Sequence, residues 1–182
     1  MQENIPARIR IKSDMLDFQF VTDRLAIGGT ISTLENMRRI AQSGITHVVD
    51  MQLEFDDRTI VGETGVEVLW IECADDFLPK PTEMFWDGAL FTLEALENPE
   101  ARVLFHCAAG IHRSPMMLLA ILRVLGYERE NARRLIGSVR PQAEFPEVYL
   151  DSVEDFVSEY RATQEESRSA APGDGTASGS VQ

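Results

Sequence analysis

The sequence predicts an α/β fold: a single domain with a central, mixed but mostly parallel sheet of about five strands, flanked by helices. Three observations lead to this prediction. The chain has 182 residues, of which 44% are hydrophobic and 26% charged, and this suits one globular domain with a sizeable core. Short apolar runs of strand character alternate with longer segments of helical periodicity. Such alternation is typical of parallel strands covered by helices on both faces.

Five strands are expected, each a short apolar run bounded by polar or glycine-containing stretches. They lie at residues 18–22, 24–29, 45–51, 66–73 and 101–107. Ligands of parallel sheets bind at the carboxyl ends of the strands, so the residues that follow these runs are the first place to look for a site.

Helices are predicted where apolar residues recur every three or four positions. The first, at 32–44, has Ser32 and Glu35 as a capping box and Gly44 at its end. The helix at 114–126 is apolar all round, so we expect it to be buried. The other helices are predicted at 81–99, 130–139 and 146–160.

Both ends of the chain are expected to lie outside the domain, which we place at residues 18–163. Residues 1–17 alternate apolar and basic residues in part, as an edge strand or a loose arm would, and lack the apolar centre of a secretory signal. Residues 164–182 are rich in Gly, Ser and polar residues and are predicted to be a disordered tail. No apolar run has the length that spans a membrane.

Charge and cysteine content limit the possible functions. The formal net charge is −13, and such a chain should repel nucleic acid and anionic membranes. Any anionic substrate therefore needs a local, directed site. Two cysteines do not make a disulfide framework, which indicates a reduced, cytoplasmic protein. The Cys and His residues lack zinc-site spacing, so we expect no metal and no cofactor. The sequence does not indicate an oligomeric state.

The strongest chemical signal is HCAAGIHRS at residues 106–114, which joins a predicted strand to the buried helix. Ser114 and Pro115 suit an N-cap and a first helical position, so this loop should lie at a helix N-terminus, where backbone N–H groups bind anions. The planar guanidinium of Arg113 suits two phosphate oxygens. The same field favours the thiolate of Cys107, a nucleophile aimed at phosphorus.

Substrate contacts are expected from the loop that follows this cysteine. A glycine in its middle lets the backbone curl tightly and approach a ligand. The residues expected to bind substrate are Ala108, Ala109, Gly110, Ile111, His112 and Arg113.

HCAAGIHRS resembles the His-Cys-x5-Arg-Ser/Thr signature of the protein tyrosine phosphatase superfamily. The upstream VLWIECADD and the downstream SPMMLLAIL resemble its dual-specificity branch, and the resemblance covers about residues 18–160. It implies that fold and a two-step reaction without a metal. Cys107 would attack phosphorus to form a phosphocysteine, while an aspartate protonates the leaving oxygen and then activates water.

The resemblance also implies roles for residues around the loop. Position assigns the general acid to Asp75, with Asp76 as the rival and Asp50 as the next candidate. Ser114 matches the hydroxyl that stabilises the departing thiolate. His106 matches a supporting histidine that orders the loop without touching substrate.

The implied substrate is a phosphoprotein or a small phosphomonoester, first of all phosphotyrosine and then phosphoserine or phosphothreonine. The loop has no lysine at its variable positions, which favours a single phosphate over phosphoinositides or inositol phosphates. Non-protein substrates, including phosphosugars, stay open as an alternative. So do a rhodanese-like enzyme, a catalytically inactive phosphopeptide-binding module and an RNA 5′-phosphatase.

Four side chains near the expected site have less certain roles. Phe77 and Phe145 could wall the pocket, and His112 is expected to face solvent. Cys73 is expected to be an ordinary core cysteine. The alternative is a redox partner of Cys107, if the strand before it neighbours the strand that ends in Cys107.

Overall fold

The computed structural model describes residues 16–170; residues 1–15 and 171–182, and with them most of the predicted arm and tail, lie outside the described residues. The strands are β1 (Phe18–Phe20), β2 (Leu25–Gly28), β3 (His47–Asp50), β4 (Glu67–Trp70) and β5 (Val103–His106). The helices are α1 (Leu34–Gln42), the short 3-10 helix η1 (Asp57–Thr59), α2 (Thr82–Glu97), α3 (Arg113–Val124), α4 (Arg129–Val139) and α5 (Glu147–Ala170).

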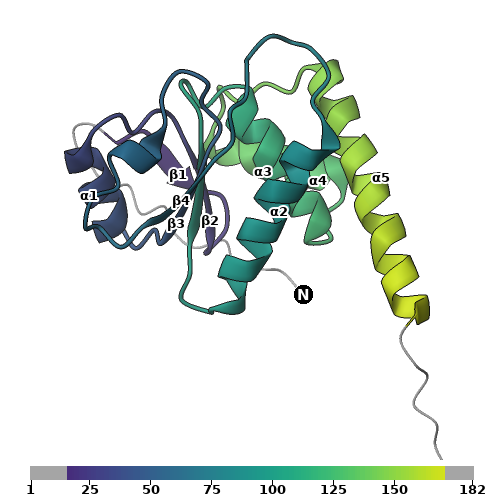
Figure 1. The fold of residues 1–182 in the computed structure, drawn as a ribbon. Coiled ribbons are helices and arrows are strands. Elements are labelled where there is room, and N and C mark those ends of the chain that lie inside the picture. Colours follow the sequence, from purple (N-terminus) through teal and green to yellow (C-terminus); the bar gives the residue numbers. More distant parts are fainter. Residues whose placement is uncertain (1–15, 171–182) are drawn as a thin grey trace, which may run out of the picture.

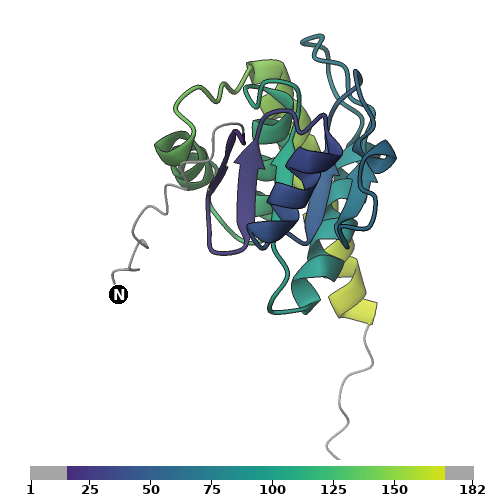
Figure 2. The same ribbon diagram turned by 90° about the vertical axis from the view of Figure 1, so that its left-hand side faces the viewer.

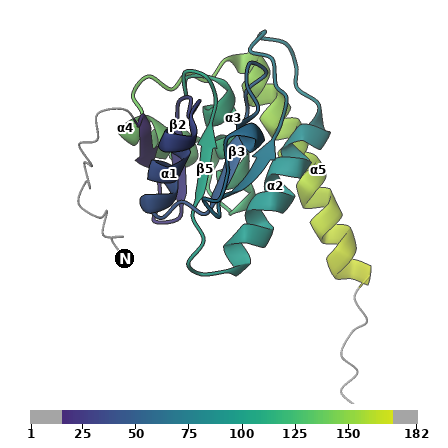
Figure 3. The same cartoon turned by 60° about the vertical axis from the view of Figure 1, so that its left-hand side comes forward.

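The five strands form one sheet in the order β1-β2-β5-β3-β4. The edge strand β1 is antiparallel to β2, and all other neighbours are parallel. The predicted fold, a single α/β domain with a mixed and mostly parallel five-stranded sheet, is therefore confirmed. β5 occupies the centre, so the loop after it leaves the middle of the sheet (Figure 3).

Helices cover both faces of the sheet. Figure 1 shows α1 on one face and α2, α3, α4 and α5 on the other, and Figure 2 shows the sheet from the side of α1. Successive β5 side chains alternate between the two layers, because neighbouring residues of a strand point to opposite faces. Val103 and Phe105 belong to the core beneath the four helices, whereas Leu104 belongs to the core beneath α1.

α3 is the central helix of the larger layer, where it contacts α2, α4 and α5. Its residues from Arg113 to Arg123 are all buried, as expected for a helix that is apolar on every side. Such complete burial holds the helix rigidly, and with it the loop that enters its N-terminus.

Two predicted helix starts are wrong, the first by one residue and the second by two. The cap of α1 is Thr33, whose side chain accepts a hydrogen bond from the Asn36 N–H at 3.1 Å. Ser32 precedes it in the left-handed region, with φ of 60°, and its hydroxyl bonds to that of Thr30 instead. α3 begins at Arg113, two residues before the predicted first position at Pro115, so Ser114 lies inside the first turn and is not an N-cap.

The last helix is longer than predicted. α5 runs to Ala170, which places residues 164–170 of the predicted disordered tail in a helix. Composition explains the difference, since this segment holds Gln, Glu, Arg and Ala, which favour helices, and the first proline comes at 172. None of the described helices is long and apolar enough to cross a membrane.

The packing of α5 onto α2 yields a prediction about stability. Phe156 is fully buried, and its ring centroid lies 5.5 Å from that of Phe85 and 5.5 Å from that of Trp86. Phe156→Ala should lower the free energy of unfolding by about 3–5 kcal/mol, because it removes a buried ring and leaves a cavity. Leu90→Ala on the exposed face of α2 is the control and should change it by less than about 0.5 kcal/mol. Urea unfolding followed by circular dichroism measures both, and similar losses in the two variants would contradict this packing.

Candidate active site

The candidate site is the loop from Cys107 to Arg113, between β5 and α3. Arg140, from the segment after α4, reaches under this loop. Its Nε donates to the Gly110 carbonyl at 2.7 Å and its Nη2 to the Ala109 carbonyl at 2.9 Å. The Arg140 side chain is itself fully buried and paired with Asp17 at 2.7 Å. These bonds turn two loop carbonyls away from the site.

The other loop carbonyls also point outward. The Thr30 N–H donates to the Ala108 carbonyl at 3.1 Å, and the Glu144 N–H donates to the Ile111 carbonyl at 2.8 Å. With four successive carbonyls facing away, N–H groups of the loop face the space above the cysteine. This is the arrangement of an anion-binding nest.

Gly110 is required at the tightest point of the loop. Its φ is +66°, a conformation that L side chains rarely adopt, and a Cβ there would clash with the Arg140 guanidinium. The Gly110 N–H points back into the loop and donates to the Cys107 sulfur at 3.2 Å.

Cys107 forms the floor of the site, with 1% of its surface exposed. Its sulfur lies 3.5 Å from the Ser114 hydroxyl, which also lies 3.4 Å from the Gly28 carbonyl. Ser114 is thus placed where its hydroxyl can donate a hydrogen bond to a thiolate.

Arg113 is held against the loop that follows β3. Its two terminal nitrogens pair with the Glu54 carboxylate at 2.8 and 2.9 Å, and Nη1 also donates to the Cys73 carbonyl at 3.0 Å. Burial is the largest single influence and opposes the charge of Arg113, but the Glu54 hydrogen bonds together with the charges of Cys107, Glu54 and Asp75 raise the arginine's pKa. The same bonds lower the pKa of Glu54. The Arg113 Nε is buried with no hydrogen-bond partner, so it has a donor to offer an anion.

The adjacent aspartates point in different directions. Asp75 turns toward the loop: its Oδ2 lies 3.8 Å from the Arg113 Nε, and the Tyr149 hydroxyl donates to its Oδ1 at 3.2 Å. Asp76 instead accepts from the Leu78 N–H at 3.0 Å and pairs with Lys80. The Lys80 hydrogen bond lowers the pKa of Asp76 and so holds it ionised. Geometry therefore favours Asp75 as a proton donor and gives Asp76 the bracing position.

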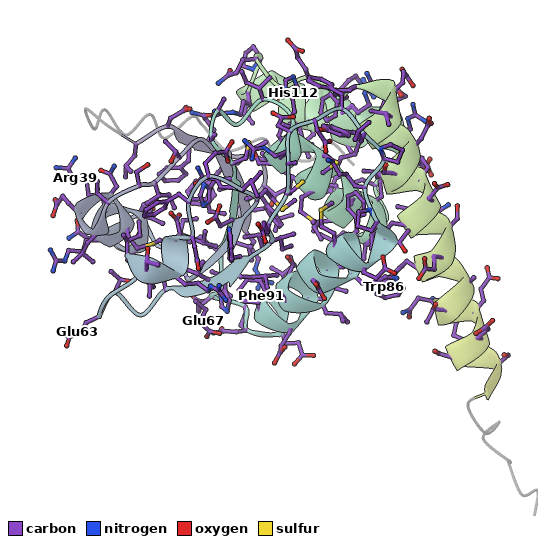
Figure 4. All side chains as sticks on the ribbon, turned by 45° about the horizontal axis from the view of Figure 1, so that its top comes forward. Arg39, Glu63, Glu67, Trp86, Phe91 and His112 are labelled. Atoms are coloured by element: carbon purple, nitrogen blue, oxygen red, sulfur yellow. The ribbon has the colours of Figure 1, made fainter. Side chains whose placement is uncertain are left out.

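His112 does not face solvent as the sequence predicted. Only 17% of its side chain is exposed, because it lies between two carboxylates: Nδ1 is 3.0 Å from the Asp75 Oδ2 and Nε2 is 3.3 Å from the Glu144 Oε2. The Phe77 ring meets the His112 ring edge-on with centroids 5.1 Å apart. Figure 4 shows His112 at the rim of the molecule.

His106 lies beneath the loop in a buried acidic cluster. Its Nε2 is 2.9 Å from the Asp57 Oδ2 and 3.5 Å from the Asp50 Oδ1, and all three side chains are fully buried. Asp50 also accepts the N–H groups of Gln52 at 2.9 Å and Asp57 at 3.1 Å, as expected for a structural acceptor. Among residues 16–170 this is the group with metal-ligand spacing. Both Asp50 oxygens are thus already occupied by backbone N–H groups.

Protonation of Asp50 should appear in the pH dependence of stability. Burial raises the pKa of Asp50 from 3.8 to about 6, so the folded chain binds this proton more tightly than the unfolded chain. Asp50 therefore makes the free energy of unfolding fall as pH rises from about 4 to about 6. We expect Asp50→Asn to remove about 1–3 kcal/mol of this fall. Urea unfolding across this range measures it, and an unchanged pH dependence in the variant would contradict the assignment.

The structure disfavours a disulfide between the two cysteines. Both are free and buried. The strand before Cys73, β4, does not neighbour β5, because β3 lies between them. Two strand spacings amount to roughly 9–10 Å, beyond the roughly 7 Å Cα limit of a disulfide. Burial also raises the pKa of Cys73 to about 11, which keeps it a thiol.

Sequence reasoning missed several residues that complete the site: Glu54, Asp57, Arg140, Glu144 and Tyr149. Only Glu54 and Asp57 could have been found from the sequence. They belong to EFDD, which follows the end of a predicted strand, where the sites of parallel sheets form. The other three lie 27 or more residues after the loop, in segments without a motif.

The fold and the signature loop are similar to those of phosphatases of the protein tyrosine phosphatase type. No family model matches the chain. Over 91 residues the chain is 35% identical to dual specificity protein phosphatase 13B of Mus musculus and 33% identical to that of Homo sapiens, covering 47% of this chain. The match covers 46% of each relative, so the chain spans less than half the length of these curated relatives.

Solved structures extend the likeness to most of the described chain. PTPMT1, solved in complex with PI(5)P, gives a TM-score of 0.71 at 21% identity and covers 81% of this chain and 98% of its own. Human DUSP28 gives 0.67 at 19% identity, with 78% and 93% covered. At these identities the solved structures show the fold alone. With the curated relatives they confirm the resemblance to the dual-specificity branch of the superfamily.

Proposed function

We propose that this chain is a cysteine-dependent phosphatase that hydrolyses phosphate monoesters through a phosphocysteine intermediate. One observation supports this above all: a buried cysteine thiol lies at the floor of a loop whose carbonyls are held outward. N–H groups and the free Arg113 Nε then converge on one anion above the sulfur.

In the proposed first step the Cys107 thiolate attacks phosphorus. The S–P bond forms, the P–O bond breaks, and the leaving oxygen takes a proton from Asp75. In the second step water attacks the phosphocysteine and gives a proton to Asp75. Inorganic phosphate leaves, and the Ser114 hydroxyl donates a hydrogen bond to the departing thiolate, 3.5 Å away in this structure. His106 supports the loop from below, in contact with Asp57.

The proposed substrates are phosphotyrosine and then phosphoserine or phosphothreonine in proteins. Phosphoinositides, inositol phosphates and phosphosugars are the alternative, since each carries the same terminal group. The proposed catalytic domain is residues 18–163. A thiol nucleophile works only when reduced, which fits the proposed cytoplasmic location. A phosphopeptide-binding module without activity is the second candidate, and it is disfavoured by the presence of a cysteine, an arginine and an aspartate at matching positions.

Replacing the nucleophile tests the proposal directly. Cys107→Ser should lower kcat at least about 10²-fold on 4-nitrophenyl phosphate, because a serine hydroxyl is far less ionised than a thiolate. Binding of inorganic phosphate, measured by calorimetry, should persist because the backbone cradle is unchanged. Cys73→Ala is the matched control and should keep most of the activity. Substantial turnover by the Cys107 variant would refute the proposal.

Paired substitutions test the general acid. Asp75→Asn should lower kcat on a phosphotyrosine peptide by about 10²-fold, with a smaller loss on 4-nitrophenyl phosphate, whose leaving group needs less protonation. Asp76→Asn should have little effect on either substrate. If the two variants exchange these behaviours, the acid is Asp76; if neither loses activity, Asp50 is the next candidate.

A further inference from the structure

The mouth of the site is built from four segments. Residues 51–60 follow β3, residues 72–81 follow β4, residues 107–113 form the loop, and residues 140–146 join α4 to α5. They touch one another around the loop through the Arg113 contacts and the bonds of His112 described above. The charges on these segments decide which group can lie beside the bound phosphate.

Every cationic side chain on the other three segments is already paired with a carboxylate. Arg58 pairs with Asp56 at 2.8 Å and lies over the Trp70 ring. Lys80 is 7% exposed and paired with Asp76. The third, Arg140, is buried beneath the loop, as described above. A substrate with a second phosphate therefore meets no unpaired cation on these segments.

Carboxylates at the mouth are paired as well, Glu54 with Arg113 and Glu144 with His112, but both stay more than half exposed. A continuous chain of contacts runs from Glu54 through Arg113, Asp75 and His112 to Glu144. The side chains at its two ends are 54% and 70% exposed, and the aspartate between them is 30% exposed. Two of these acids can each still face a cationic group of a ligand, while one buried arginine and the loop N–H groups bind the phosphate. An anionic neighbour of the phosphate is repelled by the same carboxylates.

Apolar side chains complete the mouth. Leu53, Phe77 and Leu78 are 48%, 53% and 59% exposed. Phe77 adopts a φ of 57° and is held there because its N–H donates to the Tyr149 hydroxyl at 3.1 Å and its ring stacks on the Tyr149 ring. Phe77 is thus an exposed aromatic side chain held in place by a strained backbone. Such a side chain suits contact with an aromatic ring that bears the phosphate. The carboxylates of Glu54, Asp75 and Glu144, here called the acidic rim, repel an anionic lipid surface. These apolar side chains are therefore not expected to bind the acyl chain of a lipid.

We infer that the substrate of this site is a phosphotyrosine flanked by lysine or arginine in a protein chain, and not an anionic headgroup with further phosphates. The inference rests on the proposed function and narrows its substrate class. The phosphotyrosine ring lies against Phe77, its phosphate enters the loop, and flanking cations face Glu54 and Glu144. The preference for cations beside the phosphotyrosine then comes from Glu54 and Glu144. It is separate from the chemistry at Cys107.

A peptide series tests the inference. One phosphotyrosine peptide is made with two lysines, two alanines or two glutamates beside the phosphotyrosine, and kcat/KM is measured at low and high salt. The lysine peptide should exceed the glutamate peptide by about 10-fold or more at low salt, and this ratio should shrink as salt screens the charges. Glu144→Gln should reduce the ratio about 3-fold or more. Glu63→Gln, an equal charge change far from His112 in Figure 4, should leave it unchanged.

Two results overturn the inference: equal or reversed kcat/KM for the lysine and glutamate peptides, or faster turnover of PI(5)P in neutral vesicles than of any peptide. Turnover of 4-nitrophenyl phosphate separates these results from failure of the proposed function. If it is hydrolysed without charge selection among the peptides, only the inference fails. If it is not hydrolysed, the proposed function fails, and binding of the peptides to the Cys107→Ser variant still decides the charge preference.

Discussion

The site depends on one constraint above all: four successive carbonyls of the loop after β5 must point away from the cysteine. A peptide unit presents its carbonyl and its N–H on opposite sides, so the loop binds an anion only while those carbonyls are held outside. Arg140 satisfies two of them, and backbone N–H groups from the β2–α1 and α4–α5 connections satisfy the others. The anion cradle is thus set by bonds to the outer side of the loop, away from the bound anion.

This arrangement resolves the conflict between an acidic chain and an anionic ligand. With a net charge of −13, the chain has no broad attraction for phosphate. Attraction is concentrated in oriented dipoles and one buried guanidinium, which act over a few ångströms where water is excluded. Carboxylates such as Glu54 then lie close to the phosphate site without preventing binding, because Arg113 is between them and the loop. Under the proposed function they lie beside the groups that flank the phosphate.

The fold and the central loop could be predicted from the sequence because both are local in the chain. Strand and helix periodicity gave five strands and a buried α3, and one stretch of nine residues carried Cys107 and Arg113 together. What could not be predicted depends on which segments meet in space. Glu54 and Arg113 are 59 residues apart, and nothing in either segment specifies the other. Whether Cys73 could pair with Cys107 depended in the same way on the order of the strands. No sequence pattern shows that β3 lies between β4, which precedes Cys73, and β5.

The ion pair between Arg140 and Asp17 joins residues 123 positions apart in the chain. Gly110 precedes the arginine that binds its carbonyl by 30 residues, so during synthesis this loop is made before Arg140. A chain that ends before residue 140 carries Cys107 but lacks the side chain that holds the Ala109 and Gly110 carbonyls outward. Contacts of such long range also slow folding, because a large loop must close before they form. The orientation of the loop carbonyls is thus set only once the chain extends through residue 140, and a chain cut before that residue loses the bonds on which the anion cradle depends.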